Sequence, residues 1–241
     1  MKIDMHIHSL DWEDCYSEPE DVVDEAIRKG LDAICITNHN SFEASRLVKE
    51  AGRRKGFPVF VGAEYSSSDG HLLVYGFQDE SYVKQKQRPA QEVIDYVTKK
   101  GGVVITAHPF TEHNSHQIGT KLPKLRNLIA LETINSRRTN LQNHLAEVAR
   151  GNLGLKGIGG SDAHCSRDVG NAYTEFQGNI LTMQELVHAL KHGEYEPHLY
   201  ELYKLEFDEP HYDEPEVELS LPTIQPVLFG ARFANKRYSC A

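Results

Sequence analysis

The sequence predicts an α/β fold in which short strands alternate with helices. Continuous apolar runs such as residues 31–37 (LDAICIT) are typical of strands that are buried on both faces of a sheet. Segments with one apolar face, such as residues 19–30 (PEDVVDEAIRKG), are typical of helices that cover a sheet. Because the two kinds of segment alternate along a chain of 241 residues, one parallel barrel or doubly wound sheet accommodates most of it.

The first expected strand, residues 2–8 (KIDMHIH), alternates between apolar and polar side chains. This period of two puts His6 and His8 on one face of the strand. Two imidazoles on one face, at the end of a strand, can bind one metal ion. Two half-buried histidines that only form hydrogen bonds would give the same pattern, so this pair alone leaves both interpretations open.

The helix expected at residues 19–30 has clear limits. Pro19 opens it, acidic residues fill its first turn, and Gly30 ends it. The apolar run at residues 31–37 follows directly and leads into Asn38 and His39.

The next two strands, residues 58–63 and 71–77, are expected to form an antiparallel hairpin. Only residues 65–70 separate Glu64 from His71, whereas a parallel crossover needs about a dozen residues or more. The hairpin returns His71 to the end of the sheet at which Glu64 lies.

The alternation continues through the rest of the domain, with a polar loop expected at residues 111–121. The further expected helices are residues 42–55, 89–100, 140–150 and 182–192, and the further expected strands are residues 103–107, 127–134 and 155–160.

The composition changes at about residue 194, after which acidic residues and prolines are frequent (LEFDEPHYDEPEVELSLP). We therefore expect residues 1–193 to form the α/β domain. Residues 194–241 are expected to form an acidic, proline-containing C-terminal extension that packs on the domain or trails from it.

The net charge of −9 argues against a stable nucleic-acid partner and against an anionic membrane surface. No apolar run reaches the roughly 18 residues of a membrane-spanning helix, and no signal peptide is expected. The four cysteines form no C-x-x-C pair, which favours reduced thiols and a cytoplasmic location. The sequence gives no expectation for the oligomeric state.

Histidines and carboxylates recur where the expected strands end, which is where ligand sites gather in both candidate architectures. Six histidines and three carboxylates meet this criterion, one carboxylate lying in the loop after the first strand. Buried without partners they would be costly, whereas metal ions would satisfy them together. The candidate metal ligands are His6, His8, Asp14, His39, Glu64, His71, His108, Asp162 and His164.

These strand ends resemble the motifs of the polymerase-and-histidinol-phosphatase (PHP) family of metal-dependent phosphoesterases, and they occur in the family's order over about residues 1–192. One departure is Asn38, which stands where many members carry Asp. The matching motifs are Asp4-Met5-His6-Ile7-His8-Ser9, Ile36-Thr37-Asn38-His39-Asn40, Gly62-Ala63-Glu64, His71-Leu72-Leu73, Ala107-His108-Pro109 and Gly160-Ser161-Asp162-Ala163-His164.

The resemblance implies a distorted (β/α)7 barrel that holds two or three divalent metal ions. It also implies three ligand groups in which Glu64 bridges the first two. The groups are His6, His8, Glu64 and Asp162; Glu64, His71 and His108; and Asp14, His39 and His164.

Three arginines are candidates for binding a phosphate, because guanidinium groups hold phosphate oxygens well. Arg137 and Arg138 follow the strand at residues 127–134, and Arg167 follows His164. A solvated surface charge is the alternative for each. These arginines, together with Glu64, Asp162 and His164, are the candidate catalytic residues.

Four further residues are expected near the site. Glu132 points inward from its strand, and Asp4 could accept a hydrogen bond behind the ligands. His113 and His116 lie in the polar loop and are candidates for protonating a leaving oxygen.

The function that these patterns predict is hydrolysis of a phosphate ester of a small metabolite or nucleotide by a metal-bound hydroxide. Zinc, manganese and iron all suit mixed histidine and carboxylate ligands. Two alternatives stay open: an amidohydrolase-like enzyme that cleaves carbon esters or amides, and a non-catalytic metal-binding module.

Overall fold

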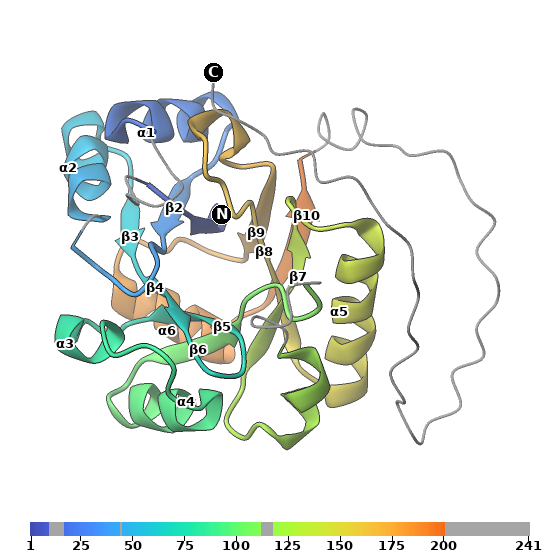
Figure 1. Cartoon of the computed structure of the whole chain (residues 1–241). Helices are drawn as coiled ribbons and strands as arrows, with labels where there is room; N and C mark the ends of the chain where they lie inside the picture. Colours follow the sequence, from blue (N-terminus) through green and yellow to red (C-terminus); the bar gives the residue numbers. More distant parts are fainter. Residues whose placement is uncertain (10–16, 44, 112–117, 201–241) are drawn as a thin grey trace, which may run out of the picture.

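The computed structural model of the chain describes residues 1–9, 17–43, 45–111 and 118–200 (Figure 1). Helices and strands alternate along most of this length. The strands are β1 Lys2–Ile7, β2 Ala33–Ile36, β3 Val59–Val61, β4 Ala63–Ser66, β5 His71–Tyr75, β6 Val103–Thr106, β7 Ala130–Asn135, β8 Lys156–Gly160, β9 Ala172–Phe176 and β10 Tyr195–Leu199. The helices are α1 Pro19–Arg28, α2 Ser45–Lys55, α3 Glu80–Val83, α4 Ala90–Lys99, α5 Asn140–Leu153 and α6 Met183–His192, with 3-10 turns η1 Gly119–Lys124 and η2 Ser166–Asp168.

The strands of the described residues form two five-stranded sheets, in the orders β10-β9-β1-β2-β3 and β4-β5-β6-β7-β8. Gly62 alone separates β3 from β4, and a bridge between Ile7 and Ala163 joins the ends of β1 and β8. The α/β class is therefore confirmed, whereas the finer prediction of a distorted (β/α)7 barrel is not.

The predicted hairpin is confirmed. β4 and β5 are antiparallel, with Glu64 opposite Leu73 and Ser66 opposite His71. The parallel pairs β1–β2, β2–β3, β6–β7 and β7–β8 follow the crossover pattern that the alternating helices predict.

Two strands were not predicted. β9 pairs with β1 and β10, and all of β10 pairs with β9, so the sheet extends beyond the predicted boundary at residue 193. β10 was missed because Pro197 and Glu196 gave it the composition of a solvated arm. A proline is tolerated there because β10 is an edge strand of its sheet.

Strands of both sheets share one hydrophobic core, which α6 completes. Met5, Ile105 and Phe176 pack there with Leu190 of α6. The Tyr75 hydroxyl donates a hydrogen bond of 2.5 Å to the Met5 carbonyl and so ties one sheet to the other. In Figure 1, α1 and α2 lie beside β2 and β3, while α5 packs against β7 and β8.

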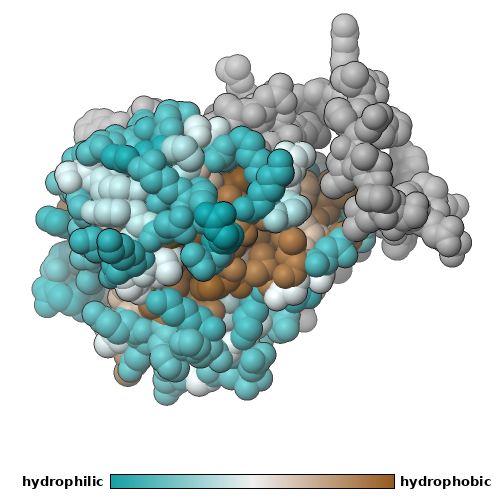
Figure 2. Space-filling model, turned by 90° about the horizontal axis from the view of Figure 1, so that it is seen from below, coloured by the Kyte–Doolittle hydropathy of each residue, from teal (hydrophilic) through white to brown (hydrophobic). Residues whose placement is uncertain are grey.

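The face seen in Figure 2 is mainly hydrophilic, with an area of hydrophobic residues in its middle. Within the described part of the chain, no helix is long and apolar enough to cross a membrane. Cys35 is a buried free thiol.

β8 comes unusually close to β1 because its sequence, KGIGG, leaves little side-chain bulk. A Cβ atom at Gly160 would stand 2.5 Å from the Cβ of His6 and 2.8 Å from Glu132 Oε1. Both neighbours are fully buried and cannot retreat. The approach of the two strands thus depends on glycine at this position.

Gly160→Ala should lower the free energy of unfolding by about 1–3 kcal/mol, the usual cost of adding atoms to a packed interior. Denaturant unfolding measures this change. Gly151→Ala is the matched control, because a Cβ there meets nothing within 4 Å and alanine favours the helix by up to about 1 kcal/mol. Equal stability of the two variants would show that the close approach of β1 and β8 is not needed.

Candidate metal centre

The structure brings eight of the nine predicted metal ligands together at one end of the strands; Asp14 lies outside the described residues. Each comes from the end of a strand or from the residues just after it. The contributing strands are β1 for His6 and His8, β2 for His39, β4 for Glu64, β5 for His71, β6 for His108, and β8 for Asp162 and His164.

Four of these side chains place their donor atoms around a common point. His6 Nε2 lies 3.1 Å from His8 Nε2, 3.5 Å from Glu64 Oε2 and 3.6 Å from Asp162 Oδ1. His8 Nε2 lies 3.3 Å from each of the same two carboxylate oxygens. Donors about 2.1 Å from one tetrahedral ion would stand roughly 3.4 Å apart, so this spacing fits a metal ion.

Glu64 lies between two sets of ring nitrogens. Its Oε1 is 2.7 Å from His71 Nδ1 and 2.9 Å from His108 Nε2. Its Oε2 is 3.0 Å from His39 Nδ1 in addition to its contacts with His6 and His8. Although Oε2 is buried, no hydrogen bond reaches it from the described residues. A cation would satisfy this oxygen, and the geometry suits a bridging carboxylate.

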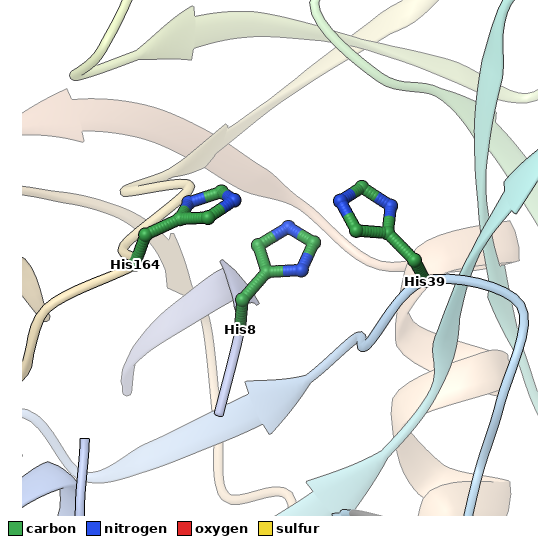
Figure 3. Close-up of side chains that lie close together, drawn as sticks. All are labelled: His8, His39 and His164. Carbon is green, nitrogen blue, oxygen red and sulfur yellow. The ribbon is translucent and has the colours of Figure 1, made fainter. Parts of the chain in front are cut away.

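A third group consists of His8, His39 and His164, whose rings lie side by side in Figure 3. The ring centroid of His8 is 4.4 Å from that of His39 and 4.3 Å from that of His164. One nitrogen from each ring lies within 4.8 Å of the others. His39 and His164 are partly exposed, so this group forms the outer rim of the cluster.

Neighbouring charges determine the pKa values of the two buried carboxyl groups, Glu64 and Asp162. Burial alone would raise the pKa of Glu64, but the neighbouring His71, His6 and His39 hold the pKa well below its usual value. Burial would also raise the pKa of Asp162, yet His6, His8 and Arg138 lower it strongly. Both carboxyls are therefore ionised, which is the form that binds metal ions.

The pKa values of the buried imidazoles are shifted in different directions. Burial lowers the pKa of His8, and burial together with the nearby Arg138 lowers the pKa of His108. For His6, burial acts in the same direction, but Glu132, Asp162 and Glu64 outweigh it and raise the pKa well above normal.

Glu132 and Asp4 lie behind the ligands. This place was predicted for Asp4, whereas Glu132 was predicted only to point inward and instead contacts the ligand His6. Glu132 Oε1 accepts a hydrogen bond of 2.9 Å from His6 Nδ1, which turns Nε2 of that ring toward the cluster. Asp4 holds main chain instead: it accepts hydrogen bonds from the amides of Ser161, at 2.9 Å, and Gly170, at 2.8 Å. Burial raises the pKa of Asp4 to about 6.

Two ligand positions have a left-handed backbone. The φ angle is +26° at His108 and +55° at Asp162. Such conformations cost roughly 1–3 kcal/mol when a side chain is present, so the surrounding contacts must hold them.

The three predicted arginines lie in different places. Arg138 Nη2 donates a hydrogen bond of 2.8 Å to Asp162 Oδ2. Arg137 contacts the His164 ring and donates to the Asp162 carbonyl at 3.3 Å. Arg167 is turned to the surface, where its side chain is 57% exposed and lies beside Asp168. His113 and His116 lie outside the described residues.

Sequence reasoning missed Asn135. Its side-chain amide Nδ2 lies 3.0 Å from Glu132 Oε2 and 3.3 Å from Asp162 Oδ2, within the fully buried layer behind the ligands. Its place at the end of a strand is the available signal in the sequence, but asparagine is not a typical metal ligand, so the ligand pattern does not include it.

Comparison with known proteins finds a family model and a relative that are similar to parts of this chain. A family model described as PHP-associated (PHP_C) matches residues 140–195. An uncharacterised protein of Methanocaldococcus jannaschii is 26% identical over 121 residues, which cover 46% of this chain and 69% of that protein.

Two solved structures share the fold. One is a two-domain protein from Bacteroides vulgatus that contains a predicted PHP-like metal-dependent phosphoesterase; it has a TM-score of 0.66 and 21% identity, covering 83% of this chain and 65% of that one. The other is an amidohydrolase from Chromobacterium violaceum with bound sulfate and no metal; it has a TM-score of 0.55 and 17% identity, covering 70% and 89%. At these identities the likeness shows the fold alone.

Replacing Glu64 tests its position between the two sets of nitrogens. Glu64→Ala should remove more than one equivalent of bound metal, because both of its oxygens face candidate ligands. Elemental analysis of the purified protein measures the loss. Glu175→Gln on β9 is the control, since Glu175 is half exposed and pairs with His198, and it should keep all of its metal. Loss of one equivalent or none in Glu64→Ala would contradict a bridging role.

Proposed function

We propose that this chain is a member of the PHP family and acts as a metal-dependent phosphoesterase on a small phosphorylated compound. The observation that carries the proposal is the set of donors around Glu64 Oε2, a buried carboxylate oxygen with no hydrogen bond from the described residues. Their chemistry and spacing suit two or three divalent ions such as zinc, manganese or iron.

Bound ions would supply a strong nucleophile at neutral pH and stabilise the attacking and leaving oxygens of a phosphate ester. The residues of the chain would hold and orient them. His6, His8, Glu64 and Asp162 would bind the first ion, and Glu64 with His71 and His108 would bind the second. His39 and His164, together with Asp14, would bind a third.

Charge supports a phosphorylated substrate. Three dications and three carboxylate ligands would leave a local charge of about +3, because bound ions dominate the charge of such a site. The chain as a whole carries −9. The site would attract a small phosphate ester, while the remaining surface would repel a long polyanion.

Arg137 is the strongest candidate for contacting the phosphate. It is exposed at the rim, beside His164, where an incoming substrate would meet it. Arg138 is already engaged with the Asp162 carboxylate, so we assign it to holding that ligand in place. Arg167 is exposed beside Asp168 and is given no role.

Hydrolysis of a carbon ester or amide is the second candidate, since the fold is shared with an amidohydrolase. The two candidates differ in substrate and share the metal centre. In the proposed centre, the bridging position is filled by Glu64, and no lysine is needed there.

Turnover of a chromogenic phosphate monoester, with manganese or zinc added to chelator-treated protein, tests the function directly. A phosphate diester, a carbon ester and an amide are assayed beside it. Metal-dependent release from a phosphate ester, abolished by Asp162→Asn, is the expected result. Cleavage of the carbon ester or amide alone would favour the second candidate, and a loaded protein that cleaves none of them would favour a non-catalytic module.

Mutation of each of the three arginines to alanine should have a different effect on turnover and metal binding. Arg137→Ala should reduce turnover about a hundredfold with metal content unchanged, because one oriented charged donor contributes roughly 3 kcal/mol to such reactions. Arg138→Ala should weaken metal binding as well, since Asp162 loses a charged partner. Arg167→Ala serves as the control and should behave as the unmutated protein. Normal turnover in Arg137→Ala would move the phosphate-binding role elsewhere.

A further inference from the structure

β7 contributes none of the eight candidate ligands, yet its carboxyl end contacts several of them. The register of β7 against β8 is irregular between Glu132 and Ile134, which pair with Ile158 and Gly159, so Thr133 is an extra residue in the strand. Such a bulge changes the direction of the side chains that follow it. Without the bulge, Asn135 would point to the face opposite Glu132; with it, both side chains point to the cluster.

The Asn135 side chain then links two carboxylates. Nδ2 donates to Glu132 Oε2 at 3.0 Å and to Asp162 Oδ2 at 3.3 Å. Oδ1 accepts a hydrogen bond of 2.9 Å from the Arg137 amide. This arrangement fixes the orientation of the side chain, because a flipped amide would turn its oxygen toward two carboxylates.

Each of these carboxylates uses its other oxygen toward the candidate metal centre. Glu132 Oε1 holds His6 Nδ1, and Asp162 Oδ1 lies 3.6 Å from His6 Nε2. One amide group therefore restrains the outer oxygens of two groups that meet at His6. Because the Asn135 amide is uncharged, it adds no positive charge near a bound metal ion.

We propose that Asn135 is a positioning residue that sets the geometry of the metal group formed by His6, His8, Glu64 and Asp162. Asn135 acts through Glu132 and Asp162 and touches neither metal nor substrate. The inference rests on the metal-binding part of the proposed function and is independent of which ester the protein cleaves. Partners of this kind typically contribute 10–100-fold to metal affinity.

Asn135→Asp tests the role. The substitution keeps the shape of the side chain, removes both N–H donors and sets a third carboxylate against Glu132 and Asp162. Titration of chelator-treated protein with zinc against a chromogenic chelator should show affinity lowered about 10–100-fold for one equivalent. An unchanged affinity would overturn the proposal.

Asn143→Asp is the matched control. The Asn143 side chain accepts from the Asn135 amide N–H and donates to the Asn135 carbonyl, both at 3.1 Å, so it holds the same residue by its main chain only. The zinc affinity of the Asn143→Asp protein should stay within about twofold of that of the unmutated protein. An equal loss of affinity in both variants would show that Asn135 has only a structural role.

A double variant provides a further measurement, which a general loss of protein stability would not affect. Glu132→Gln with Asn135→Asp restores an amide–carboxylate pair with donor and acceptor exchanged. The double variant should bind zinc more tightly than the product of the two single effects predicts. Strictly multiplicative effects would overturn the link through Glu132. If the unmutated protein binds zinc tightly but cleaves no phosphate ester, the proposed phosphoesterase function would be rejected. The role of Asn135 in metal binding would still stand.

Discussion

The contact on which the rest of the structure depends is the one between the Glu64 carboxylate and the imidazoles around it. Nitrogens of five histidines lie between 2.7 and 3.5 Å from its two oxygens, in an interior where an isolated carboxylate would be very costly. The hairpin of β4 and β5 supplies His71, and the bridge between His39 and Glu64 brings in the end of β2. The close approach of β1 to β8 adds His6, His8 and Asp162. The arrangement of the strands thus brings five histidines to the Glu64 carboxylate.

The candidate site has two layers with different origins. The inner donors come from six strand ends in both sheets, and they include every histidine of the cluster. The layer behind them comes largely from β7, which supplies Glu132 and Asn135, and from Arg138 in the turn that follows this strand. An inner layer assembled from many strands gains precision when one strand holds several of its members from behind.

The inner layer could be predicted from the sequence because its rule is local. Histidines and carboxylates that follow apolar runs must meet if the strands are parallel, and the short connection from Glu64 to His71 fixes the one exception. Asn135 could not be predicted in this way, since its direction depends on a bulge that the period of two does not reveal. β10 was missed because edge strands tolerate the polar and proline-containing sequences that otherwise indicate loops. The places of Arg138 and Arg167 depend on loop conformation, and the strand pattern carries no information about it.

The crowding of ring nitrogens and carboxylates described above has a consequence for folding. An ion that binds these groups in the native state, and binds the unfolded chain weakly, raises the free energy of unfolding by mass action. The native population then depends on the free concentration of that ion as well as on temperature and denaturant. Each tenfold increase in the free ion concentration above the dissociation constant adds about 1.4 kcal/mol to the free energy of unfolding. Thermal unfolding in the presence of different divalent cations would therefore rank their affinities for this chain before any substrate is known.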